Sequence, residues 1–262
     1  MWDPHTYLKY GDERARPFVD LVARIGADSP SSVVDLGCGP GNLTAWLAGH
    51  WPGARISGID SSAEMIARAR AVGSTVDFSL GDVRQWRPDS TVDVVISNAT
   101  LQWVPDHDRL LIDWVRGLRP GGWLAVQVPG NFNAPSHQAL RLVAAAPRWR
   151  DRLETLIRSP ADVLEPAGYA ALLLAAGATV DAWETTYLHL LGSTGSGGEH
   201  PVLSWMEGTA LRPIRAALTD PAEWNAFRAQ LAAQLTAAYP AHNGVVPFAF
   251  RRIFFTAQSR RS

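Results

Sequence analysis

The chain has 262 residues, a formal net charge of -1 and 47% hydrophobic residues, which is enough for a large core in one α/β domain. A near-neutral charge argues against nucleic acid as a partner, and no uncharged run is long enough to span a bilayer. The single cysteine, Cys38, excludes an internal disulfide. We therefore expect a cytoplasmic protein with no membrane anchor and no obligate protein partner.

The first part of the chain, residues 1–25, is predicted to form a flap and a helix. Residues 1–10 are aromatic and polar and too few to make a core of their own, so this segment either frays or packs as a flap. From Asp12 to Ile25 the apolar residues recur at helical spacing, which predicts a helix.

A short apolar run from Ser32 to Leu36 stops abruptly at three glycines, Gly37, Gly39 and Gly41. This pattern predicts a buried parallel strand, a loop that lets a cofactor approach the backbone, and a following helix that ends near Gly49. The G-x-G-x-G spacing departs from the G-x-G-x-x-G of dinucleotide sites, which argues against an NAD(P) oxidoreductase.

Two side chains refine the interpretation of this loop. Asp35, at the end of the strand, would repel phosphates but would suit a cationic ligand. Cys38 lies inside the loop, where we expect a small packing residue rather than a nucleophile. A plain glycine-rich turn remains the alternative to a cofactor loop.

The second predicted strand, 54–59, ends in Asp60. This residue lies roughly twenty positions beyond the glycines, where an acidic side chain meets ribose hydroxyls. A carboxylate can accept hydrogen bonds from both hydroxyls of a vicinal diol, although an ordinary turn aspartate is the alternative. Ser61 is predicted to cap the next helix, with Glu64 as its capping-box partner.

Further strands are predicted over 76–80, 92–97 and 123–128. Ligands of a doubly wound sheet bind beyond the carboxyl ends of its strands, at the switch point of the strand order. The segment from Asn98 to Trp103 is therefore the predicted floor of the reaction site. The aromatic face of Trp103 would attract a cation, although packing in the core is nearly as good an interpretation.

The last third of the chain is predicted to be mixed. A sixth strand over 179–191 and a final strand over 251–258 bracket two helical stretches, 202–218 and 222–239, with Pro213 interrupting or starting a helix. We interpret 199–246 as a helical insertion between the last two strands, and as a substrate lid.

Together these motifs resemble class I S-adenosylmethionine-dependent methyltransferases, through the loop after Asp35, through Asp60 and through the Leu118-Arg-Pro-Gly-Gly122 turn. The resemblance implies one domain, 1–262, with a Rossmann-like, mostly parallel sheet of seven strands, and S-adenosylmethionine as cofactor. It also implies that Asp82 holds the adenine amino group and that the next backbone N–H meets the ring. The residues expected to hold the cofactor are Asp35, Gly37, Cys38, Gly39, Gly41, Asn42, Asp60, Ser61, Asp82, Val83, Asn98, Gln102 and Trp103.

Further segments are similar to bacterial trans-aconitate 2-methyltransferases in particular. They are Trp2-x-Pro-x-x-Tyr-Leu8, Glu13-Arg-x-Arg-Pro17, Ala99-x-Leu-Gln-Trp-x-Pro-Asp-His107 and Trp205 with Leu211-Arg-Pro213. The similarity covers nearly the whole chain. It implies that the methyl group of S-adenosylmethionine esterifies one carboxylate of trans-aconitate, a small tricarboxylate.

This reaction places few demands on the side chains. A carboxylate is already ionised at neutral pH, so in-line methyl transfer needs positioning but no general base, and we expect neither a catalytic residue nor a metal site. The other carboxylates need cations, and Arg212 is the expected clamp. Tyr7, Tyr10, Trp103 and Tyr187 are the expected walls. An exposed helix residue is the alternative for Arg212.

Three other functions stay open at this point. The chain could methylate another small acid or an amine, with the same cofactor residues and a different lid. It could bind S-adenosylmethionine without catalysis, as a scaffold. A nucleic-acid methyltransferase is disfavoured by the net charge.

Overall fold

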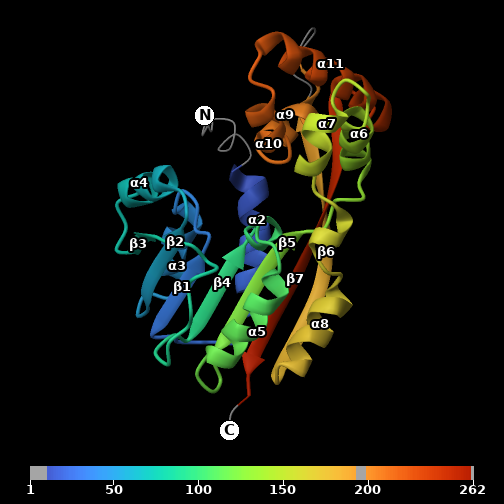
Figure 1. Cartoon of the computed structure of the whole chain (residues 1–262). Helices are drawn as coiled ribbons and strands as arrows, with labels where there is room; N and C mark the ends of the chain where they lie inside the picture. The colour runs from blue at the N-terminus through green and yellow to red at the C-terminus, as the bar shows by residue number, and fades with distance from the viewer. Residues whose placement is uncertain (1–10, 193–198, 261–262) are drawn as a thin grey trace. The chain divides into compact units, whose positions relative to one another are not determined.

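The computed structural model describes residues 11–192 and 199–260. They form an α/β fold with a sheet of strand order β3-β2-β1-β4-β5-β7-β6 (Figure 1). The strands are β1 (Ser32–Leu36), β2 (Arg55–Asp60), β3 (Asp77–Leu80), β4 (Val94–Asn98), β5 (Trp123–Pro129), β6 (Ala178–Gly192) and β7 (Val245–Ser259). The expected Rossmann-like, mostly parallel sheet of seven strands is confirmed.

The strand order reverses between β1 and β4. From β1 the chain continues outward to β2 and β3, whereas from β4 it continues to β5 on the other side, and all of these neighbours pair in parallel. The strand β7 is antiparallel to β5. The carboxyl ends of β1 and β4 therefore lie side by side at the switch point, where such sheets bind ligands.

Helices cover both faces of the sheet. The helices α2 (Gly11–Val22) and α3 (Asn42–His50) lie together on one face, where the rings of Phe18 and Trp46 meet edge to face with centroids 6.2 Å apart. The helices α5 (His107–Gly117) and α8 (Pro166–Ala175) lie on the other face (Figure 1). The helix α4 (Ala63–Ala71) packs against β3.

The chain divides into two compact units. Of the described residues, the first unit, which we call the sheet unit, comprises Ala15–Pro129, Val163–Thr185 and 252–260. The second, which we call the helical unit, comprises 11–14, Gly130–Asp162, 186–192 and 199–251. The helical unit thus includes residues 130–162, which lie before the predicted insertion, 199–246. Its role as a lid stays a prediction.

The helical unit has a hydrophobic core of its own. Its helices are α6 (Pro135–Ala144), α7 (Arg150–Leu153), α9 (Pro201–Glu207), α10 (Arg212–Ala217) and α11 (Pro221–Ala238). Trp149, Trp205 and Phe227 are among its most deeply buried side chains. Arg228 binds Glu199 and Glu207, which joins α11 to α9 and to the residues before it.

The helical stretch expected over 202–218, with Pro213 interrupting or starting a helix, contains two helices. A turn follows α9, and α10 begins at Arg212 with Pro213 in its first turn, where the missing N–H costs little. One predicted strand of this region was wrong in its bounds. The final strand begins at Val245 and not at Arg251. Its earlier part is a strand because Val246, Phe248 and Phe250 alternate into the core of the helical unit.

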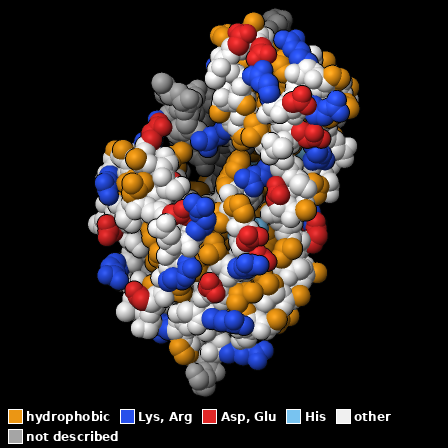
Figure 2. All heavy atoms as spheres, in the orientation of Figure 1, with side chains coloured by type: hydrophobic (Ala, Val, Ile, Leu, Met, Phe, Trp, Pro, Cys, Tyr) orange, Lys and Arg blue, Asp and Glu red, His pale blue; other side chains and the backbone are white. Residues whose placement is uncertain are grey.

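Acidic and basic side chains are interspersed on the face drawn in Figure 2, and neither sign forms an extended patch there. Across 11–192 and 199–260, no helix has the length and apolar character that crossing a membrane requires.

Candidate active site

The glycine loop after β1 has a strained backbone that glycine tolerates. Gly37, Gly39 and Gly41 have φ angles of 82°, 56° and 81°. A Cβ added to Gly37 would lie 2.0 Å from Oγ1 of Thr100, and one on Gly41 would lie 2.7 Å from the Phe78 ring. A Cβ on Gly39 would meet nothing within 4 Å, so this glycine borders open space.

The carboxylate of Asp60 joins the loops that follow β1 and β2. It accepts hydrogen bonds from the backbone N–H of Gly39 at 2.9 Å and of Ser62 at 2.8 Å. Each carboxylate oxygen keeps a further lone pair, so the group can still accept hydrogen bonds from ribose hydroxyls.

The capping prediction for α4 was wrong by one residue. The N-cap is Ser62, whose hydroxyl accepts from the N–H of Met65, and not Ser61, which is exposed. The reason is the bond from Ser62 N–H to Asp60, which extends the loop by one residue. Glu64 then binds Arg68 at 2.9 Å instead of closing a capping box.

Asp35 is a carboxylate inside the sheet unit. It is 3% exposed, and the Thr44 hydroxyl donates to it at 2.6 Å. Burial raises its pKa to about 7; the bond from Thr44 opposes the shift, and the charge of Asp60 adds to it. A buried carboxylate whose ionisation is costly is stabilised by a cationic ligand.

Cys38 is buried against Ile66, Ala69 and Phe78. Burial and the neighbouring carboxylates Asp35 and Asp60 raise the pKa of its thiol, so the thiolate that a nucleophile requires is disfavoured. These contacts agree with the packing role expected for Cys38.

Asp82 follows β3 and is held by an arginine. Nε of Arg84 donates to the two carboxylate oxygens at 3.0 and 2.9 Å, and this pairing lowers the pKa of Asp82. Val83 beside it is buried. The adenine contacts of these two residues stay predictions.

The segment after β4 contacts the glycine loop. The Thr100 hydroxyl donates to the carbonyl oxygen of Gly37 at 3.3 Å, and Nε2 of Gln102 donates to that of Ala99 at 2.6 Å. Oδ1 of Asn98, at the end of β4, is buried and has no hydrogen-bond partner among the described residues. Trp103 is 40% exposed.

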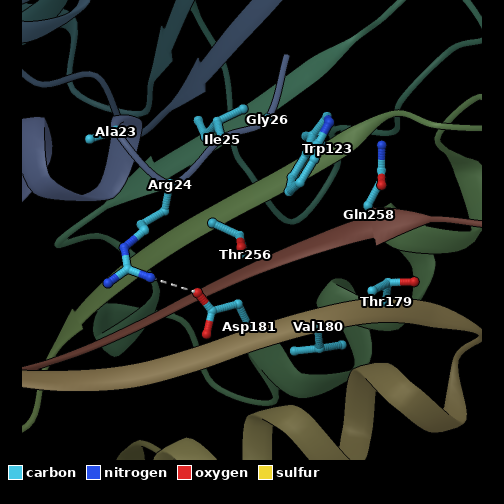
Figure 3. Close-up of a pocket in the computed structure, with 10 residues that line it drawn as sticks. All are labelled: Ala23, Arg24, Ile25, Gly26, Trp123, Thr179, Val180, Asp181, Thr256 and Gln258. Atoms are coloured by element: carbon cyan, nitrogen blue, oxygen red, sulfur yellow. Dashed lines mark hydrogen bonds and ion pairs between the residues drawn. The ribbon is translucent and has the colours of Figure 1, made fainter. Parts of the chain in front are cut away.

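A cavity of about 390 Å³ lies elsewhere in the sheet unit (Figure 3). It is lined by Trp123 at the start of β5, Thr179 near the start of β6 and Gln258 near the end of β7. The ion pair of Arg24 and Asp181, 3.3 Å apart, lies at its side. These residues lie at the amino ends of the parallel strands, whereas the glycine loop follows the carboxyl end of β1. This cavity is therefore not the predicted cofactor site.

Comparisons with known proteins identify the family. The family model described as "Methyltransferase domain" matches residues 34–126. The trans-aconitate 2-methyltransferase of Mycobacterium sp. (strain KMS) is 53% identical and aligns over 99% of this chain and 100% of its own length. The chain belongs to the trans-aconitate 2-methyltransferase family.

Other relatives agree. The trans-aconitate 2-methyltransferase of Streptomyces coelicolor is 51% identical over 98% of this chain and 86% of its own. That of Mycobacterium tuberculosis is 49% identical over 100% of this chain and 99% of its own. The expected resemblance is confirmed: the chain is an S-adenosylmethionine-dependent methyltransferase.

Solved structures share the fold at low sequence identity. The phosphoethanolamine N-methyltransferase 2 of Haemonchus contortus, solved with S-adenosyl-L-methionine, is 14% identical, with a TM-score of 0.55 over 94% of this chain and 53% of that chain. The YcgJ protein of Bacillus subtilis is also 14% identical, with a TM-score of 0.56 over 94% of this chain and 99% of that chain.

The sheet unit of this methyltransferase fits the family's cofactor. Gly39 borders open space, Asp35 supplies a buried carboxylate, and Asn98 has a buried acceptor atom with no partner among the described residues. Asp60 can hold a diol beside them. An amino acid, a sulfonium and a ribose are the groups that such a set suits.

The structure places the other predicted residues as follows. Asn42 is exposed at the start of α3, in the sheet unit. Tyr187 and Arg212 belong to the helical unit, where Tyr187 is 3% exposed and Arg212 is exposed at the start of α10. Tyr7 and Tyr10 lie outside the described residues.

Sequence reasoning missed one buried polar pair. Gln127 in β5 and Arg252 in β7 are 0% and 5% exposed, and Nη1 of Arg252 donates to Oε1 of Gln127 at 3.1 Å. A signal was present for Gln127, because it is the one polar residue of the apolar strand β5, which is unusual in the centre of a sheet. Arg252 gave a weaker signal, because Arg251 and other polar residues share β7.

Proposed function

We propose that this methyltransferase forms the monomethyl ester of trans-aconitate. S-adenosylmethionine supplies an electrophilic methyl group when it is bound, and one carboxylate of the acid takes that group. The observation that carries the proposal is the 53% identity to a trans-aconitate 2-methyltransferase over 99% of this chain and 100% of that enzyme. The segments of this sequence that resemble that enzyme, including Leu211-Arg-Pro213, support it.

The residues of the sheet unit hold the cofactor in this proposal. Asp35 faces the cationic amino acid part, Asp60 accepts from the ribose hydroxyls, and Asp82 with the N–H of Val83 takes the adenine. Asn98, Gln102 and Trp103 border the reacting centre. The acid is ionised at neutral pH, so the protein positions it and removes water, and needs no general base.

Arg212 is our candidate for the clamp on a non-reacting carboxylate. Arg212 is an exposed residue, and a guanidinium can bind a carboxylate with two hydrogen bonds. We expect Arg212→Ala to raise KM for trans-aconitate roughly 10- to 100-fold, the effect of losing a charged hydrogen bond, with cofactor affinity nearly unchanged. The matched control is Arg116→Ala, which replaces an exposed arginine of α5 and should change neither KM nor cofactor affinity. An equal fall in cofactor affinity for Arg212→Ala would show the assignment to be wrong.

The reaction itself is tested by methyl-ester formation. The assay compares trans-aconitate with citrate, isocitrate and cis-aconitate, and mass spectrometry identifies the ester. With S-adenosylmethionine labelled on its methyl group, we expect far more label in trans-aconitate than in any of the other three acids. Labelling of a different acid, or of an amine, would move the protein to another substrate. Cofactor binding without turnover on any acid would favour a non-catalytic role.

We place the reaction in the cytoplasm, without membrane or nucleic acid. The free Cys38 is compatible with a reducing compartment. The interspersed charges in Figure 2 are compatible with a small-molecule substrate rather than a polyanion.

A further inference from the structure

Three polar side chains lie in neighbouring strands at the ligand-binding edge of the sheet unit. Asn98 ends β4 and is the register partner of Gln127 in β5, and Arg252 in β7 is the register partner of Pro129, the last residue of β5. Register partners, and residues two apart in a strand, project from the same face of a sheet. Asn98, Gln127 and Arg252 therefore form one polar row, which crosses three strands.

The row begins beside the cofactor loop. The Thr100 hydroxyl donates to the carbonyl oxygen of Gly37, and the N–H of Ala99 donates to that of Gln127 at 2.9 Å. Asp35 projects from the same face, because its register partner Ile96 lies two residues before Asn98. The polar row is thus continuous with the residues that the cofactor requires.

The hydrogen bond between Gln127 and Arg252 fixes which way the glutamine amide points. A guanidinium has only donors, so the atom of Gln127 that faces Arg252 must be the oxygen. Nε2 of Gln127 therefore points elsewhere, and this donor is buried with no hydrogen-bond partner among the described residues. A buried donor of this kind is costly unless an acceptor is provided.

We propose that Gln127 and Arg252 form a carboxylate subsite for the substrate acid. Arg252, which is 5% exposed, supplies a buried positive charge, and Nε2 of Gln127 supplies a directed N–H donor. A carboxylate that is not methylated is the acceptor that both groups suit. In this arrangement the hydrogen-bond acceptor of the row, Oδ1 of Asn98, serves the cationic cofactor. The donors of the row, on Gln127 and Arg252, serve the anionic acid. This inference rests on the proposed function.

The test is Gln127→Glu, measured with KM and kcat for trans-aconitate. Glu keeps the shape of Gln and accepts the bond from Arg252 more strongly, so a purely structural role predicts an intact or more stable enzyme. A substrate role predicts a weaker enzyme, because the new carboxylate removes the N–H donor of Gln127 and repels the acid. We expect KM to rise roughly 30-fold or more, kcat to change less, and cofactor affinity by equilibrium binding to stay within about twofold.

Two further variants keep the test decisive. Gln258→Glu is the matched control, since it adds the same charge to β7 near Gly121, at the opposite edge of the sheet, and should leave KM unchanged. Arg252→Lys keeps the charge and loses the bidentate geometry, and should raise KM by a smaller factor than Gln127→Glu. Thermal unfolding of each variant separates a lost fold from a lost subsite.

The outcomes separate this inference from the proposed function. A wild-type enzyme that methylates trans-aconitate and a Gln127→Glu variant with the same KM would overturn the subsite alone. A wild-type enzyme that binds the cofactor but neither binds nor methylates trans-aconitate would overturn the proposed function, and the subsite with it. A raised KM for Gln127→Glu with intact cofactor binding is the result that the subsite predicts.

Discussion

The two units build their surfaces in different ways. The sheet unit offers a ligand its backbone and a few carboxylates: three glycines with positive φ, the buried Asp35 and the bridging Asp60. The helical unit packs five helices and parts of β6 and β7 around an aromatic core with Trp149 and Trp205, and Arg228 pairs there with two glutamates.

This difference separates two kinds of recognition. A backbone loop fits one ligand shape and changes little when side chains change, so it suits a cofactor. Side chains carried by short helices can be exchanged one by one, so they suit the selection of a substrate. We therefore propose that the cofactor is bound by residues of the sheet unit alone, and Arg212 of the helical unit stays our candidate for a clamp on the acid. The following variants test this division.

Trp149→Ala should have the largest effect on stability. Its indole is 0% exposed and donates to Oε1 of Gln230 at 2.9 Å, so the change should cost roughly 3–5 kcal/mol in the free energy of unfolding. Urea denaturation measures this loss. Cofactor affinity should stay within about twofold of wild type. Trp46→Ala, at a position that is 40% exposed, is the control and should cost less. A parallel loss of cofactor affinity in Trp149→Ala would contradict the division.

Asp35→Asn should stabilise the cofactor-free protein, by an amount that depends on pH. The folded-state pKa is raised from 3.8 to about 7, so folding favours the protonated form. The cost of ionisation is absent below pH 3.8, grows as pH rises, and is complete above about pH 7, where it is on the order of 4 kcal/mol.

Unfolding curves for Asp35→Asn and wild type at pH 4 and pH 8, without cofactor, test this sign. The gain in the free energy of unfolding should be near zero at pH 4 and greatest at pH 8. In a separate binding measurement at pH 8, cofactor affinity should fall, because the substitution removes the anionic partner of the cofactor. An equal gain at both values would mean that ionisation of Asp35 is not its source.

Gly39→Ala should affect the cofactor more than the fold. Its φ of 56° costs an L-residue roughly 1–2 kcal/mol, but its new Cβ would meet no protein atom within 4 Å. If the cofactor occupies that space, overpacking should weaken its binding roughly 10- to 100-fold. Gly49→Ala, where the added Cβ also meets nothing, should weaken neither binding nor folding. Unchanged binding in Gly39→Ala would place the cofactor elsewhere.

Asp82→Asn should have the smallest effect. An exposed hydrogen bond is worth about 1 kcal/mol, so cofactor Kd should rise about fivefold. Asp77→Asn, an exposed change in the same strand region, is the comparison variant and should leave Kd as it was. Titration calorimetry with S-adenosylhomocysteine resolves this difference. Equal Kd values for both variants would remove Asp82 from the adenine contact.

Much of the sheet unit could be predicted from the sequence. The run Ser32–Leu36 has a strong strand pattern and ends in glycines, and local signals of this kind depend on neighbours in the chain. Asp60 was predicted from its spacing to those glycines. The structure brings the two positions together through the hydrogen bond that the N–H of Gly39 donates to Asp60, and the ribose contact of Asp60 stays a prediction.

The remaining features depend on contacts that the sequence does not display. The N-cap moved to Ser62 because a tertiary loop geometry sets the bond to Asp60. The early part of β7 is a strand because it packs on helices far away in the sequence. Gln127 and Arg252 are 125 positions apart, so no local pattern joins them.

The most direct test of the division is cofactor affinity in two variants, Gly39→Ala and Arg212→Ala, measured by equilibrium binding beside KM for trans-aconitate. We expect Gly39→Ala to lose cofactor affinity, whereas Arg212→Ala should keep it and raise KM. Loss of cofactor affinity in both variants would contradict a cofactor site formed by the sheet unit alone.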